Sequence, residues 1–224
     1  MKRILALVAV LVMMGSLCSC GKNTNAFKVS KAAYSELKRA YEIIEAYSSD
    51  VYIAWMCGIY HDDEILEQGT EYLASQLSLS EDEIRDGVAH TFSCDFWKQD
   101  WDTVSEEDKQ TLRDLSDGTF SLYEEDLFSF CIQVVSNAYA ANGKTAEIEG
   151  ALSEAKAQMK TLSEKYSDYT YYPKLKEFYT TVDSFFHFCE DPFGNSFKQM
   201  TDAIEKYKNQ ARDYQSDLDY IFED

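Results

Sequence analysis

An acidic and aromatic stretch carries the clearest potential for binding chemistry in this chain. Its central members are Trp97, Trp101, Asp100 and Asp102. Carboxylates at such spacing could hold a calcium ion, but Val104 stands where the calcium loop needs a ligand and the turn glycine is missing. Two expectations stay open for this stretch. Either these four residues contact a small or cationic ligand, or the tryptophans pack beside a capped helix.

The histidines follow no metal-binding or catalytic pattern. The chain has three of them, His61, His90 and His187. None belongs to a Glu-x-x-His or His-Glu-x-x-His motif, the patterns that place metal ligands on one helix face. The chain also lacks a phosphate-binding glycine loop and a Gly-x-Ser-x-Gly nucleophile elbow. The sequence therefore predicts no catalytic residue, no metal site and no cofactor.

Four cysteines lie beyond the N-terminal segment, at Cys57, Cys94, Cys131 and Cys189. In an exported chain an even number suggests disulfides, and four cysteines allow three pairings. Each of them also has apolar neighbours at a helical position, where free thiols are commonly buried. No two have the close spacing of a redox dithiol or a zinc knuckle. Buried thiols and disulfides of undefined pairing are both expectations.

The first 20 residues have the layout of an export signal. Lys2 and Arg3 precede an uncharged run, residues 4–14, and small residues then lead to Cys20. The uncharged run is shorter than the roughly 20 residues with which a helix crosses a bilayer. We therefore expect a cleaved signal rather than a permanent transmembrane helix.

The end of this segment resembles the lipobox of bacterial lipoproteins. Leu17 and Ser19 occupy positions −3 and −1 relative to Cys20, whereas a site at Cys18 would put Gly15 in the leucine position. The resemblance covers residues 1–20 only. It implies that residues 1–19 are removed and that the Cys20 sulfur carries a diacylglyceryl group. Two acyl chains form a stable anchor, at about 0.8 kcal/mol per buried CH₂. The implied location is the extracytoplasmic face of the cell membrane, with membrane lipid as the partner of Cys20.

The sequence after Cys20 predicts a short tether and an acidic domain. Gly21 to Asn25 is polar, which predicts that residues 20–28 form a flexible connection. Removal of residues 1–19 leaves 19 basic and 40 acidic residues, a net charge of −21. Nucleic acid is a poor partner for such a domain, because a binder needs a basic face to displace phosphate counterions.

Apolar periodicity predicts an all-α fold for residues 29–224. Because 45% of the residues are hydrophobic and only two are prolines, we expect long ordered helices rather than disorder. Apolar side chains recur every three or four residues over 148–166, 172–189 and 193–221. Short connections place neighbouring helices antiparallel, so residues 145–222 are expected to form an up-down bundle.

The N-terminal half reads as one long helix and several shorter ones. Their expected ranges are 29–60, 62–76, 80–96, 105–115 and 122–139. Residues 97–118 are rich in helix breakers, so we place a possible subdomain boundary there.

Two classes of function agree with these features. The first is a non-enzymatic lipoprotein whose helical domain contacts another protein or scaffolds an envelope complex. The alternative is a binding module for a small or cationic peptide ligand, which an exposed cleft at Trp97 or Trp101 would favour and burial of both rings would oppose. An enzyme is a third reading, and it would need strongly perturbed carboxylates near His61 or His90.

Overall fold

The computed structural model describes the backbone of residues 2–192 and 196–223, and the side chains of residues 23–192 and 196–223. Over these residues the protein is α-helical without β-strands, which confirms the predicted all-α fold class. In the same part of the chain, no helix is both long enough and apolar enough to span a bilayer.

The helical segments are α1 (Lys2–Tyr60), α2 (Asp62–Gln76), α3 (Glu81–Phe92), α4 (Glu106–Asp114), α5 (Ser116–Thr119), α6 (Leu127–Ala141), α7 (Lys144–Lys165), α8 (Tyr172–Glu190) and α9 (Phe197–Phe222). Most of them lie close to the predicted ranges, but α6 begins at Leu127 rather than at residue 122, and α5 was not predicted. A π-helical turn, Ser93–Trp97, follows α3, and 3₁₀ turns occupy Trp101–Thr103 and Phe120–Asp126.

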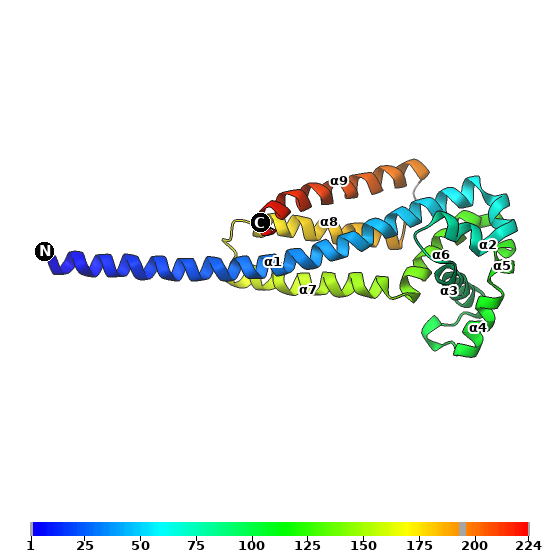
Figure 1. Ribbon diagram of the computed structural model, residues 1–224, viewed down its shortest axis with the longest axis horizontal. Helices are drawn as coiled ribbons and strands as arrows, with labels where there is room; N and C mark the ends of the chain where they lie inside the picture. Colours follow the sequence, from blue (N-terminus) through cyan, green and yellow to red (C-terminus); the bar gives the residue numbers. More distant parts are fainter. Residues whose placement is uncertain (1, 193–195, 224) are drawn as a thin grey trace.

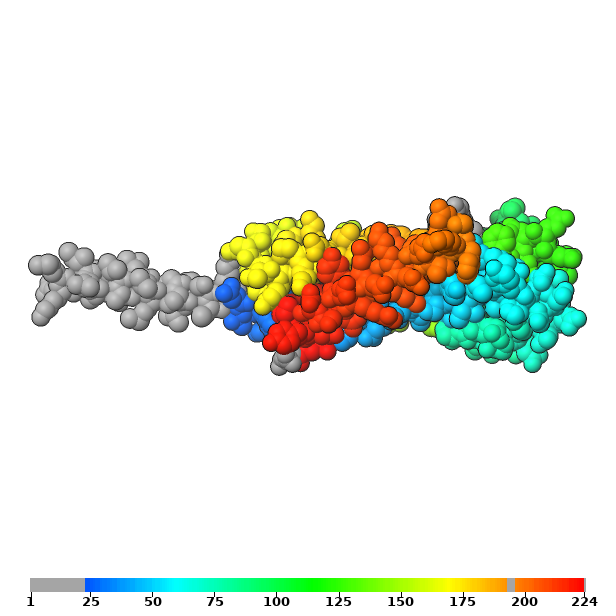
Figure 2. Space-filling model, turned by 90° about the horizontal axis from the view of Figure 1, so that it is seen from above, coloured from blue at the N-terminus to red at the C-terminus, as the bar shows by residue number. Residues whose placement is uncertain are grey.

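The molecule is elongated along α1, as Figure 1 shows. Helices α7, α8 and α9 pack along α1 between Phe27 and Trp55, while α2 to α6 gather at its C-terminal part. Helix α9 runs antiparallel to α1, because Phe27 meets Phe222 at one end and Tyr52 meets Phe197 near the other. The antiparallel bundle predicted for residues 145–222 is thus present, with α1 as its fourth helix. Figure 2 shows the same elongated outline from above.

Helices α1 and α7 pack along each other, and both bury small side chains. Ala33 and Ala40 of α1 and Ala151 and Ala155 of α7 are all fully buried. With only a methyl group at these positions, the two helices can pack closely and larger residues fill the space on either side. These larger buried residues include Leu37, Ile44, Ile148 and Leu162.

Two glycines allow α6 to lie against α1 and α3. A Cβ atom at Gly58 would fall 2.4 Å from the Cα of Phe128, and one at Gly87 would fall 2.2 Å from the carbonyl oxygen of Val134. Both distances are far shorter than any normal contact, so only glycine fits. Helix α6 therefore joins the bundle to the short helices.

The structure differs from the predicted flexible tether over residues 23–28. Residues 23–28 continue α1, Ala26 is 1% exposed, and the ring of Phe27 lies 5.5 Å from that of Phe222. The physical reason is that Ala26, Ser30 and Ala33 continue the buried stripe of α1 with small side chains. Residues 20–22, the rest of the expected tether, lie outside the residues whose side chains are described.

Residues 97–118 pack on α3 through a small apolar cluster. Its members are Ala89, Trp101, Val104 and Leu112. The larger core includes buried residues of α1, α2, α3, α6, α7, α8 and α9. The bundle thus shares one core with α2, α3 and α6, whereas α4 packs on α3 through the separate small cluster.

Candidate functional site

Trp101 belongs to the packed interior of the acidic and aromatic stretch. It is 7% exposed, and its ring is stacked on the ring of His90 with 5.2 Å between their centres. The Nζ atom of Lys109 lies 5.1 Å from the Trp101 ring centre, a cation–π distance. The Trp101 ring is therefore occupied by protein neighbours, as expected for a tryptophan that packs beside a capped helix.

Trp97 is placed differently, with 40% of its surface exposed at the end of the π-helical turn. The side chain of Asp100 accepts a hydrogen bond from the backbone N–H of Asp102 and so caps the 3₁₀ turn. Both of these carboxylates are exposed. The four predicted contact residues are therefore divided between one buried ring, one exposed ring and a local turn.

Burial disfavours the protonated form of His90. Its Nδ1 atom is buried and has no hydrogen-bond partner among the described residues. Desolvation lowers the pKa of His90, and the negative charges of Asp102 and Asp100 oppose this only in part. In the described part of the chain, no group of three or more His, Cys, Asp or Glu side chains is arranged to hold a metal ion.

The four cysteines beyond the N-terminal segment are free thiols in the structure. Cys57, Cys131 and Cys189 are buried, whereas Cys94 is partly exposed. Burial raises the pKa of the Cys131 and Cys189 thiols above the usual thiol range. A raised pKa leaves little thiolate at neutral pH, so these two sulfurs are poor nucleophiles.

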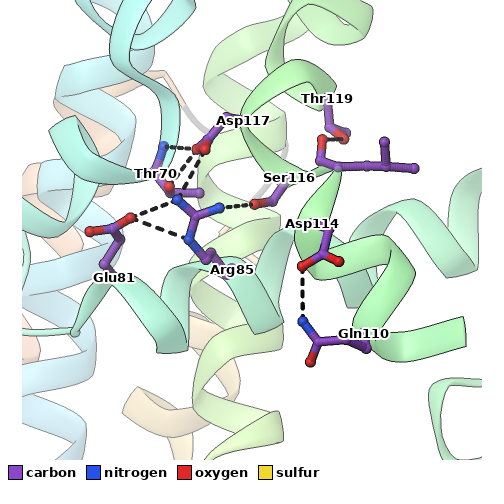
Figure 3. Close-up of polar contacts among 9 residues, drawn as sticks. Thr70, Glu81, Arg85, Gln110, Asp114, Ser116, Asp117 and Thr119 are labelled. Atoms are coloured by element: carbon purple, nitrogen blue, oxygen red, sulfur yellow. Dashed lines mark hydrogen bonds and ion pairs between the residues drawn. The ribbon is translucent and has the colours of Figure 1, made fainter. Parts of the chain in front are cut away.

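A polar network centres on Arg85 of α3 and joins α2, α3 and α5 (Figure 3). One guanidinium nitrogen, Nη2, lies 2.6 Å from Glu81 Oε1 and 3.0 Å from Asp117 Oδ2. The other, Nη1, donates a 2.9 Å hydrogen bond to the hydroxyl of Ser116. Through Ser116 and Asp117 the guanidinium cross-links α3 to α5.

Asp117 also belongs to this network, and it accepts hydrogen bonds from Thr70 where α2 is interrupted. The helix is interrupted at Gly69, whose φ is 52° and ψ is −118°. Asp117 Oδ1 accepts hydrogen bonds from the hydroxyl of Thr70 at 2.6 Å and from its backbone N–H at 3.4 Å, much as an N-cap residue does. Partial burial acts to raise the pKa of Asp117, but the hydrogen bonds from Thr70 and Arg85 outweigh it and hold the pKa below its usual value.

A polar cavity of about 500 Å³ adjoins this network between α3 and α4. Its lining residues are Asp82, Arg85, Asp86, Gln110, Arg113 and Asp114. Arg113 is ion-paired with Asp86, and Arg85 is paired as described above. An anionic ligand would have to displace these carboxylates. The arrangement thus serves to hold α3, α4 and α5 together better than it would bind an anion.

A second groove, of about 430 Å³, lies between α1 and α9 and contains a serine–lysine contact. Lys208 Nζ donates to Ser49 Oγ at 2.8 Å, and Ser49 Oγ donates to the carbonyl oxygen of Glu45 at 2.9 Å. Burial lowers the pKa of Lys208, although the charge of Glu45 opposes the change. The contact links α9 to α1 beside the groove.

The sequence reasoning missed the structural role of Asp50. This buried carboxylate accepts hydrogen bonds from the backbone N–H of Ser78 at 2.9 Å, from the hydroxyl of Ser78, and from the hydroxyl of Tyr139 at 2.9 Å. It thereby ties α1 to the α2–α3 connection and to α6. Ser78 and Tyr139 are 28 and 89 residues away in the chain. No local motif could have indicated these pairings.

Cys20, the predicted lipidation site, lies outside the residues whose side chains are described. The structure does show the position of Asn23, the first residue after Cys20 whose side chain is described. Asn23 follows three residues later at the end of the bundle formed by the α7–α8 connection and the C-terminus of α9. Comparison with known proteins identifies no relative, because no family model, curated protein or solved structure matches this chain.

Proposed function

We propose that the protein is a bacterial lipoprotein held on the extracytoplasmic face of the membrane by Cys20. Its helical domain acts as a non-enzymatic interaction module that presents its far end to a protein partner. The supporting observation is the short stretch of chain between the lipobox and the first buried residue of the bundle. Ala26 is already buried in the bundle, only six residues beyond Cys20. An acyl chain on Cys20 would therefore hold a rigid rod by its end.

The far end of this rod carries most of the exposed large hydrophobic side chains among the described residues. Among the described residues, eight large hydrophobic side chains are exposed, and six of them belong to the C-terminus of α1 or to the segment 96–122. These six are Ile59, Tyr60, Phe96, Trp97, Leu115 and Leu122. Exposed apolar side chains concentrated in one region are typical of protein interaction sites. From Asn23 to Tyr60, α1 is roughly 56 Å long at 1.5 Å per residue, which sets the reach of this end.

The anchor is tested with two cysteine variants of the full-length chain. Cells expressing the wild type, Cys20→Ala or Cys18→Ala are labelled with radioactive palmitate and then fractionated. The wild type and Cys18→Ala should incorporate label and remain with the membrane, whereas Cys20→Ala should do neither. Because the two cysteines are two positions apart, Cys18→Ala controls for general damage to the signal. Equal labelling of all three proteins, or an unlabelled cytosolic wild type with residues 1–20 intact, would refute the anchor.

The interaction surface is tested by crosslinking on intact cells. A photoreactive amino acid replaces Tyr60 at the far end or, as a matched control, the exposed Tyr220 near the C-terminus of α9. We expect a defined protein neighbour to be captured from position 60 and to be missing from position 220. The same set of bulk surface proteins at both positions would contradict the interaction module.

The alternative, a binding module for a small or cationic peptide ligand, has less support. It would have to use Trp97 without Trp101, because His90 and Lys109 cover the Trp101 ring.

A further inference from the structure

We propose that the bundle end next to Cys20 makes a second contact with the membrane, in which aromatic rings lie among the lipid headgroups. We call this region the aromatic end. It consists of Phe27, Tyr166, Tyr169, Tyr171 and Tyr172. The inference rests on the proposed lipid anchor and adds to it a fixed orientation of the whole rod.

A chain of ring contacts gathers these residues at one end of the molecule. The ring of Phe222 is 1% exposed, and it lies 5.5 Å from Phe27 and 6.2 Å from Tyr171. Tyr171 in turn lies 5.5 Å from Tyr169. Phe222 is thus the buried centre of the group. Phe27, with 37% of its surface exposed, and the partly exposed tyrosines form the outer side.

The α7–α8 connection lies beside residues 23–27 of α1. A hollow of about 400 Å³ is lined by Asn23, Thr24 and Phe27 from α1 and by residues 168–170 from the connection. From Cys20 to Asn23 the chain advances three residues, which span at most about 11 Å even when fully extended. The headgroup layer of one leaflet is roughly 5–8 Å thick. An acylated Cys20 therefore keeps the aromatic end near the lipid surface.

The side-chain chemistry of the aromatic end suits a lipid interface. Tyrosine is enriched where a membrane meets water, because its ring is apolar and its hydroxyl remains hydrated. Four tyrosines occur within the seven residues 166–172, and a phenylalanine faces them from α1.

The local charge also differs from that of the whole domain. Residues 22–39 contain five basic side chains and one carboxylate, although the mature domain as a whole has a net charge of −21. Lys28 and Lys31 are exposed, and neither forms an ion pair within the described part of the chain. Asp168 and Glu223 lie at the same end. We therefore expect ring insertion, rather than charge attraction, to dominate the contact.

Fluorescence quenching by brominated lipids tests this contact directly. The diacylated full-length protein is reconstituted into phosphatidylcholine vesicles whose acyl chains are brominated near the headgroup, or into unbrominated vesicles. Tyr169→Trp and Phe27→Trp introduce an indole at the aromatic end. Tyr60→Trp introduces one at the far end, where Tyr60 is 61% exposed. The native tryptophans contribute the same background to all three variants, and circular dichroism checks that each variant is folded.

We expect the indoles introduced by Tyr169→Trp and Phe27→Trp to lose about half of their emission in brominated vesicles, and the one introduced by Tyr60→Trp to lose none. Flotation on a density gradient separates the possible failures. If the protein floats with the vesicles but neither indole at the aromatic end is quenched, the second contact is refuted while the anchor stands. If all three are quenched, the rod lies flat and the proposed orientation is refuted. Failure to float would refute the anchor and the inference with it.

Discussion

The conformation of Gly69 makes this residue the most sensitive position of the Arg85 network. Its φ of 52° is costly for any residue with a Cβ atom, and an added Cβ would lie 3.2 Å from Asp117 Oδ1. We predict that Gly69→Ala lowers the free energy of unfolding by about 1–3 kcal/mol. Urea denaturation of the domain measures this. Gly118→Ala is the control, because a Cβ there meets no atom within 4 Å. Equal stability of Gly69→Ala and wild type would show that the positive φ at residue 69 does not require glycine.

Protonation of Asp117 in acid should make the domain less stable. Hydrogen bonds lower the pKa of Asp117 in the folded chain below its ordinary value. The contribution of this group is therefore complete above its unfolded pKa, about 3.9, and is lost as the pH falls through the lower folded value. We predict that Asp117→Asn reduces the loss of stability between pH 7 and pH 3.

Urea midpoints measured at both pH values give the comparison. Asp114→Asn serves as the control, because Asp114 accepts a hydrogen bond from Gln110 but does not contact Arg85 or Thr70 in Figure 3. An unchanged pH dependence in Asp117→Asn, or the same change in both variants, would contradict the assignment.

At the scale of single elements, the crossing of α3 and α6 depends on one missing side chain. A Cβ at Gly87 would lie 2.2 Å from the carbonyl oxygen of Val134 and 3.1 Å from the backbone nitrogen of Ala138. Both obstacles are backbone atoms, so α6 would have to move. We predict that Gly87→Ala destabilises the domain by about 1–3 kcal/mol.

The matched control for this crossing is Gly150→Ala in α7. Gly150 has open space around its Cα, and alanine is the better helix former by about 0.5–1 kcal/mol. The two substitutions should therefore have opposite signs in thermal or urea unfolding. Two small effects of the same sign would mean that α3 and α6 do not approach each other closely.

The helices could be predicted because each carries its own periodic signal, whereas the contacts between distant elements could not. The predicted range 62–76 agrees with α2, and α3 begins with a capping box formed by Ser80 and Glu83. The expected tether failed in residues 23–28 because the buried stripe there consists of Ala26 and Ser30, which look like linker residues in a sequence.

The candidate site was predictable only as a set of residue types. The sequence identifies Trp97 and Trp101 as aromatic, but their exposure depends on how the 98–104 turn folds back onto α3. His90, which covers Trp101, could not be paired with it from spacing alone. The roles of Asp50 and Asp117 depend in the same way on partners that only the folded chain brings near.

At the scale of the whole molecule, the proposed function requires a rod rather than a globule. A compact domain of about 200 residues has a radius of gyration of roughly 16 Å. Residues 23–60 of α1 alone span about 56 Å, and α7 to α9 lie along this part of the helix (Figure 1). We predict a radius of gyration clearly above 16 Å for the monomeric domain from residue 23 onward, measured by small-angle X-ray scattering. Light scattering on the same sample establishes that it is monomeric. A value near 16 Å would mean that α1 bends back on itself, and the far end would then lose the reach that the interaction module needs.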